Sequence, residues 1–92
     1  MGSTNGTFPT MNTALAAYLK TEGFTHTDTT ANPKLHNPKD FDAVFHFQDD
    51  PHILDCVHLW NTRQAVGNLS VFLDNYRQFI AEAKSIVRVA EA

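Results

Sequence analysis

The chain has a single cysteine, Cys56, and no long run of apolar residues. One cysteine cannot form a disulfide within the chain, so non-covalent contacts must stabilise the fold. No segment approaches the roughly 18 consecutive apolar residues of a membrane-spanning helix. The first residues also lack the basic and apolar regions of a secretion signal. These absences favour a cytoplasmic protein with no membrane role.

The motifs of common enzyme and metal sites are missing as well. The sequence contains no H-E-x-x-H or C-x-x-C spacing, no glycine-rich phosphate loop and no nucleophile elbow. We therefore expect a non-enzymatic protein with no catalytic residue and no cofactor. One alternative stays open, because His52 and Cys56 are four residues apart and could share a metal ion on one face of a helix. A small metal-binding or enzymatic domain would use that pair.

Length and composition indicate one compact unit. The chain has 92 residues, of which 42% are hydrophobic and 11% aromatic. A chain of this length forms one domain with one modest core. We expect residues 1–9 to be a flexible polar leader and residues 10–92 to form the domain.

The first regular element is expected to be a helix over residues 11–22. Its apolar residues recur with helical spacing: Met11, Ala14, Leu15, Tyr18 and Leu19. Thr10 or Asn12 would cap its start. Gly23 suits the left-handed position after a helix, and Phe24 would then fold back on Leu19.

An antiparallel hairpin should follow this helix. The threonine-rich stretch 24–32 favours an edge strand with one wet face. Two Asn-Pro pairs in residues 32–38 indicate a loop. Residues 41–48 then alternate, with Phe45 and Phe47 on one face and Asp42 and His46 on the other, as in a half-buried strand.

Two helices are expected to complete the domain. Asp50 and Pro51 favour a helix start, and Ile53, Cys56, Val57 and Trp60 would form the buried face of a helix that ends near Asn61. From Leu69 a helix of about 20 residues should carry an apolar stripe. The stripe contains Leu69, Leu73, Tyr76, Ile80, Ala83, Val87 and Ala90, widened by Phe72, Phe79 and Ile86. The expected class is therefore α+β in the order α-β-β-α-α: helix, antiparallel β-hairpin, short helix and long C-terminal helix.

Several apolar residues in this pattern resemble an uncharacterised family of small bacterial and phage proteins, a domain of unknown function. The shared pattern spans roughly residues 12–80 and comprises Leu15, Tyr18, Gly23, Phe24, Phe45, Phe47, Trp60, Phe72 and Tyr76. The loop "NPKLHNPKD" is longer here than the family pattern suggests. The resemblance implies an α+β fold, an origin in a mobile element and the cytoplasm of a bacterial or phage-infected cell. It transfers no catalytic residue.

Charge is the strongest functional signal. The net charge is −3, yet five acidic residues and no lysine or arginine lie between Asp40 and Thr62. Surface carboxylates are usually only solvated, but a concentrated patch can attract a basic protein surface. We expect a small interaction protein, of the inhibitor or nucleic-acid-mimic type, with an acidic strand–helix surface. Its candidate partner-binding residues are Asp42, His46, Asp49, Asp50 and Asp55.

The last helix offers a second expected surface. Its stripe would support a homodimer through residues 69–90, although packing within the domain explains the same stripe. Arg77, Lys84 and Arg88 lie on a broad side of this helix and could contact nucleic acid, which gives a nucleic-acid-binding accessory protein as an alternative. Three cations are few for phosphate binding, so nucleic acid is the less favoured partner.

Overall fold

The computed structural model describes residues 6–91 of the chain. Its elements are β1 (Thr7–Thr10), α1 (Thr13–Thr21), β2 (His26–Pro33), β3 (Phe41–Gln48), α2 (Ile53–Asn61) and α3 (Leu69–Glu91). The predicted α+β class is confirmed, including the hairpin, the short helix and the long C-terminal helix. Within residues 6–91, no helix has both the length and the apolar character needed to cross a membrane.

The sheet has one strand more than the sequence predicted. Its order is β1-β3-β2, and both pairings are antiparallel. Residues 7–9, expected to belong to a flexible leader, instead form most of β1, where Phe8 lies opposite Phe47. Four residues including a proline give almost no local strand signal, because a strand this short depends on the neighbour with which it pairs. The folded domain therefore begins before residue 10.

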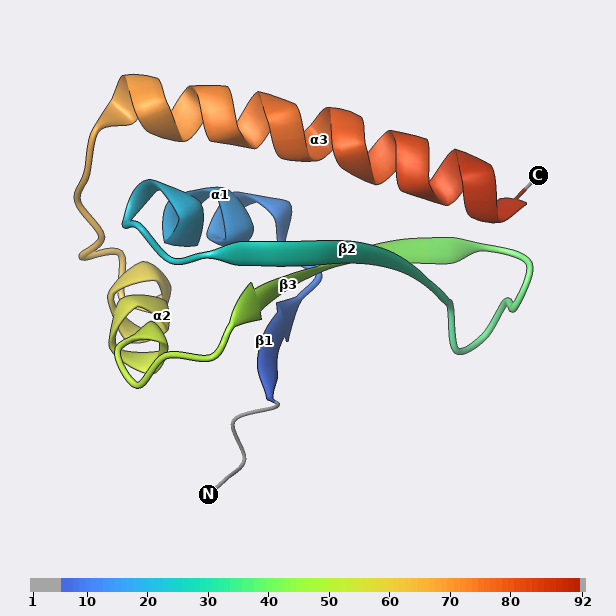
Figure 1. Ribbon diagram of the computed structural model, residues 1–92, viewed down its shortest axis with the longest axis horizontal. Coiled ribbons are helices and arrows are strands. Elements are labelled where there is room, and N and C mark those ends of the chain that lie inside the picture. The colour runs from blue at the N-terminus through green and yellow to red at the C-terminus, as the bar shows by residue number, and fades with distance from the viewer. Residues whose placement is uncertain (1–5, 92) are drawn as a thin grey trace.

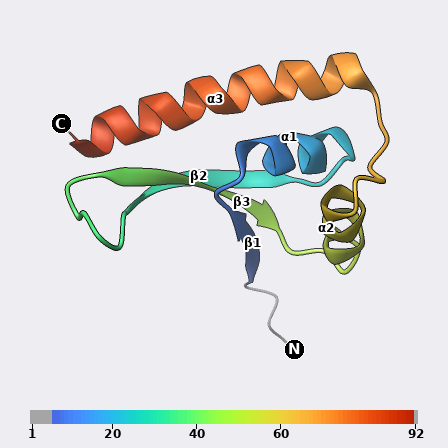
Figure 2. The same ribbon diagram turned by 180° about the vertical axis from the view of Figure 1, so that it is seen from behind.

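The sheet has helices on one side. Figures 1 and 2 show α1 and α3 stacked over the same face of β2 and β3, while α2 lies near one end of the sheet. The prediction that Phe45 and Phe47 of β3 face the core is confirmed, because both are buried in the core formed with α1 and α3. Val44, which the alternation places on the other face, is buried as well. The prediction of an edge strand is confirmed as well, since within residues 6–91 β2 pairs with β3 alone.

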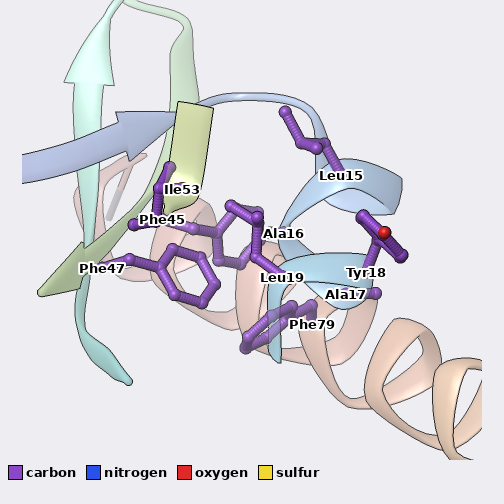
Figure 3. Close-up of a cluster of buried hydrophobic side chains, with 9 residues drawn as sticks. All are labelled: Leu15, Ala16, Ala17, Tyr18, Leu19, Phe45, Phe47, Ile53 and Phe79. Atoms are coloured by element: carbon purple, nitrogen blue, oxygen red, sulfur yellow. The ribbon is translucent and has the colours of Figure 1, made fainter. Parts of the chain in front are cut away.

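The core centres on aromatic side chains from β3 and α3. The ring centroid of Phe79 lies 4.7 Å from that of Phe45 and 6.3 Å from that of Phe47. Figure 3 shows these rings facing Leu19 of α1. Ala16 and Ala17 are fully buried and, being small, let α1 lie close to its neighbours. Each buried phenylalanine stabilises the fold by roughly 2–3 kcal/mol through apolar area removed from water.

The ends of α1 match the expected chemistry. The Asn12 side chain accepts a hydrogen bond from the Leu15 N–H at 3.0 Å, which identifies Asn12 as the cap. At the other end Gly23 has a φ of 99°, and the Phe24 N–H donates to the Leu19 carbonyl at 3.1 Å. This is the predicted left-handed helix ending.

The buried side of α3 differs from the predicted stripe. Phe79 and Asn75 are the buried residues of this helix, whereas Leu69 is 69% and Leu73 37% exposed. Asn75 is tolerated there because its side-chain N–H donates to the Thr21 hydroxyl at 3.1 Å. The apolar residues at the start of α3 are consequently left at the surface.

The Phe79 contact gives a stability prediction. Replacing Phe79 with alanine should lower the free energy of unfolding by about 3–5 kcal/mol, because a cavity would open between α3 and the sheet. The matched control is Val89→Ala on the same helix, where the side chain is 72% exposed and the change should stay within about 0.5 kcal/mol. Denaturant unfolding measures both. Equal losses would show that Phe79 is not the main anchor of α3.

Candidate protein-docking site

A row of aromatic rings connects the three helices near the start of α3. The Tyr18 ring of α1 stacks on the Trp60 ring of α2 with centroids 5.5 Å apart. The Trp60 ring lies 6.2 Å from that of Phe72 in α3, and Phe72 stacks on Tyr76 at 5.9 Å. Aromatic pairs at these separations add stabilisation beyond the area that they bury. The row therefore holds α2 against both other helices.

Beside this row lies a pocket of about 390 Å³. Its walls come from α1, from the end of α2, from the segment that links α2 to α3, and from the first turn of α3. The lining residues are Tyr18, Thr21, Trp60, Ala65, Val66, Gly67, Asn68, Leu69 and Phe72. This volume, the mainly apolar wall and the few polar groups are typical of sites that accept a ligand or a partner side chain.

The α2–α3 link is directed along the pocket by a tight helix ending. After α2, Arg63 has a φ of 61°, a conformation that non-glycine residues seldom adopt. The Gln64 N–H donates to the Leu59 carbonyl at 2.8 Å and the Arg63 N–H to the Trp60 carbonyl at 3.1 Å. Such an ending normally has glycine in the position of Arg63. The surrounding hydrogen bonds hold the arginine there, and it lies beside Trp60 and Ala65.

Glu22 lies at the rim of the pocket. A Cβ atom added to Gly67 would be 3.1 Å from a Glu22 carboxylate oxygen, so the carboxylate packs against a residue of the pocket wall. The absence of a side chain at Gly67 permits this approach. Two apolar side chains of the wall are also exposed to solvent, Val66 at 79% and Leu69 at 69%. The opening therefore combines apolar surface with a negative charge.

Three acidic residues act on one thiol behind this aromatic row. Burial raises the pKa of the Cys56 thiol, and the negative charges of Glu22, Asp55 and Asp50 raise this pKa further. The neighbouring Tyr18 hydroxyl lowers the pKa of Cys56 and partly opposes the rise. Burial also raises the pKa of Tyr18, with Glu22 as the second cause. Glu22 just after α1, Asp55 of α2 and Asp50 in the β3–α2 turn therefore form one negative region around Cys56.

The structure separates the five predicted partner-binding residues. Asp42 lies near the start of β3, where it lines a groove with Lys84 and Arg88 of α3, and the His46 ring contacts Thr7 and Thr30 of the neighbouring strands. Asp49 and Asp50 follow the opposite end of β3, roughly 23 Å from Asp42 at 3.3 Å per strand residue. Asp55 is on α2 with its side chain 82% exposed. The helix-side members, Asp50 and Asp55, share with Glu22 an effect on the Cys56 thiol, and the strand-side members, Asp42 and His46, form a separate group.

The strand-side residues already have partners. Asp42 lies 3.8 Å from the Lys34 ammonium group. The His46 ring nitrogens lie 2.9 Å from the Thr30 hydroxyl and 3.5 Å from the Thr7 hydroxyl. These contacts link β3 to both of its neighbours. They explain His46 as a residue that joins the three strands.

The two residues of the possible metal pair, His52 and Cys56, lie in different environments. The His52 ring is 78% exposed and its Nδ1 lies 3.9 Å from Asp55, whereas Cys56 is half-buried beside Tyr18. Among residues 6–91, no group of three histidine, cysteine, aspartate or glutamate side chains is arranged to bind a metal ion. The expected helix start also shifts, because Asp50 accepts from the His52 N–H at 2.8 Å in a turn that precedes α2.

Two features were not identified from the sequence. Glu22 lies outside the acidic stretch, and only the return of the α2–α3 link brings Gly67 against it. The second feature joins β2 to α3: His26 Nε2 lies 2.8 Å from the Thr29 hydroxyl and 3.6 Å from a Glu82 oxygen, and Thr29 donates to Glu82. No spacing in the sequence relates residues that are 53 positions apart.

The raised pKa of Cys56 predicts slow thiol chemistry. A raised pKa means less thiolate at neutral pH, so alkylation of folded protein by iodoacetamide should be slower than that of the urea-unfolded chain. Glu22→Gln removes one negative charge and should lower the Cys56 pKa, shifting the pH profile of alkylation toward lower pH. Glu91→Gln, far along α3, is the control. An unchanged profile in the Glu22 variant would contradict the negative region.

Comparison with known proteins adds the family to this geometry. No curated protein and no solved structure matches the chain. A family model does match residues 5–88, which include every strand and most of α3. The predicted resemblance to an uncharacterised domain is thereby confirmed, and the chain belongs to the family described as Domain of unknown function (DUF5659).

Proposed function

We propose that this chain is a small non-enzymatic protein-binding module. Its docking site is the pocket beside Trp60 together with the acidic residues Glu22, Asp50 and Asp55. The carrying observation is an apolar pocket whose rim bears a carboxylate. Its partner is a protein segment with one apolar side chain that enters the pocket and with basic residues beside it.

Apolar burial supports an apolar partner side chain in the pocket, and charge supports basic residues beside it. An apolar side chain of the partner would cover Val66 and Leu69 and remove them from water. This burial would contribute roughly 25 cal/mol of binding free energy for each Å² of apolar surface. Basic residues beside it would meet Glu22 and the α2 carboxylates and would raise the association rate. Arg63 is a cation that lies beside Trp60. It would favour an acidic residue in the part of the partner segment that contacts the Trp60 side of the pocket.

This site retains the helix part of the expected acidic surface. It is compatible with the inhibitor or nucleic-acid-mimic role expected from the sequence, if the bound segment is the nucleic-acid-binding surface of a cytoplasmic partner. The alternative nucleic-acid contact through α3 has less support, because Arg77 lies 3.9 Å from Asp74. Lys84 and Arg88 line a groove that also contains Asp42 and Glu91.

The single tryptophan gives a direct test, because Trp60 lines the pocket. The probe is a blocked, tryptophan-free peptide with one leucine between lysines. Titration should change the Trp60 fluorescence, and added salt should weaken the binding. A peptide with glutamates in place of the lysines, and one with serine in place of the leucine, should each bind at least about tenfold more weakly, equal to about 1.4 kcal/mol.

Two matched substitutions locate the contact. Val66→Lys places a cation and a bulky chain in the opening and should abolish the fluorescence change. Val89→Lys adds the same group to an equally exposed valine outside the pocket lining, and binding should remain. Equal affinity for the lysine and glutamate peptides, or no response of Trp60 to any of the peptides, would refute the proposed function.

A further inference from the structure

The β2–β3 loop of this chain has the chemistry that the docking site requires. Residues 34–40 read Lys-Leu-His-Asn-Pro-Lys-Asp. The side chain of Leu35 is 90% exposed, the highest value among the large apolar residues that lie at the surface of the described chain. Lys34 precedes it and Lys39 follows, so an apolar side chain lies between two cations.

The loop presents Leu35 from a hydrogen-bonded frame. The Lys34 N–H donates to the Asp40 carbonyl at 2.8 Å, and the Asp40 N–H donates to the Asn37 carbonyl at 2.9 Å. The Asn37 side chain donates to the Asp40 carboxylate at 3.0 Å. A loop closed in this way loses less conformational entropy on binding than a free chain. Leu35 is therefore displayed without an apolar neighbour to cover it.

The loop cannot enter the pocket of its own molecule. Figures 1 and 2 show the β2–β3 loop at the end of the molecule where α3 terminates, and α2 with the α2–α3 link at the other end. The molecule measures 37 Å along its longest axis. Any contact between loop and pocket must consequently join two copies of the chain.

We propose that the docking site binds the β2–β3 loop of a second copy, with Leu35 in the pocket beside Trp60. This rests on the proposed function and names its partner as another copy of the chain. Lys39, which has no ion-pair partner among residues 6–91, would face Glu22. Asp40 would lie toward the Arg63 side. The charges of loop and pocket are thus opposite in sign at both edges.

The contact is heterologous, because it pairs two different surfaces. Each copy keeps a free loop at one end and a free pocket at the other, so association continues into rings or chains rather than stopping at a dimer. This distinguishes it from the homodimer through α3 expected from the sequence, in which one surface would meet its own copy.

Two variants together test the proposal. Leu35→Asp disables the loop and Val66→Lys disables the pocket, so each variant alone should be monomeric by light scattering at concentrations where the native chain forms species larger than a dimer. An equimolar mixture should form a heterodimer and nothing larger, because it contains one intact loop–pocket pair. Val89→Asp changes an exposed valine outside loop and pocket and should associate like the native chain.

A charge exchange tests the facing ion pair. Lys39→Glu should weaken association, and adding Glu22→Lys in the same chain should restore it. Lys84→Glu on α3 is the control: alone it should leave association unchanged, and adding Glu22→Lys to it should weaken association, because Lys39 would then face a lysine.

Three results would overturn the proposal. One is a native chain that is still monomeric at about 1 mM. At that concentration a contact with a dissociation constant of about 1 mM would be half populated. Another is association that survives both Leu35→Asp and Val66→Lys, and the third is a mixture of the two variants that stays monomeric. If the lysine–leucine peptide binds Trp60 while the native chain is monomeric, only this inference fails. If the peptide also fails, the proposed function fails with it.

Discussion

The contact of Phe79 with the rings of β3 fixes the position of the long helix. Phe79 is 2% exposed, and its ring also lies 4.9 Å from that of His26 at the edge strand. Phe79 lies near the middle of this 23-residue helix, so the helix extends beyond the contact in both directions. The N-terminal end therefore extends over α2, where Phe72 meets Trp60. The pocket exists because α3 is held at that place.

Polar contacts then set the rotation of α3 about its axis. Asn75 donates to Thr21 on α1, and Glu82 accepts from Thr29 on β2. Buried polar groups without partners are costly, so these pairs favour one packing of the helix over its neighbours. This rotation turns Leu69 toward solvent and the pocket opening. The apolar stripe is thus divided between core and surface by a few hydrogen bonds.

Local rules predicted much of the fold. Gly23 and Phe24 indicated how α1 ends, and the alternation around Phe45 and Phe47 indicated which face of β3 is buried. These signals depend on neighbours within one helical turn or one strand. β1 was missed because its stability comes from pairing with β3, about 40 residues further along. The sequence also could not predict that Asn75, and not Leu73, is buried in α3. Asn75 is buried because it donates a hydrogen bond to Thr21, which lies on another helix.

The candidate site shows the same division. The sequence by itself determined the acidic character around Asp50 and Asp55 and the apolar side of α2 that carries Trp60, because composition and helical period are properties of a continuous segment. Only the tertiary structure decided that Glu22 joins these acids, that Asp42 and His46 lie apart from them, and that Leu35 is exposed at the opposite end. The physical reason is that distances between elements depend on how β3, α1 and α3 pack, and packing joins residues that no local pattern relates.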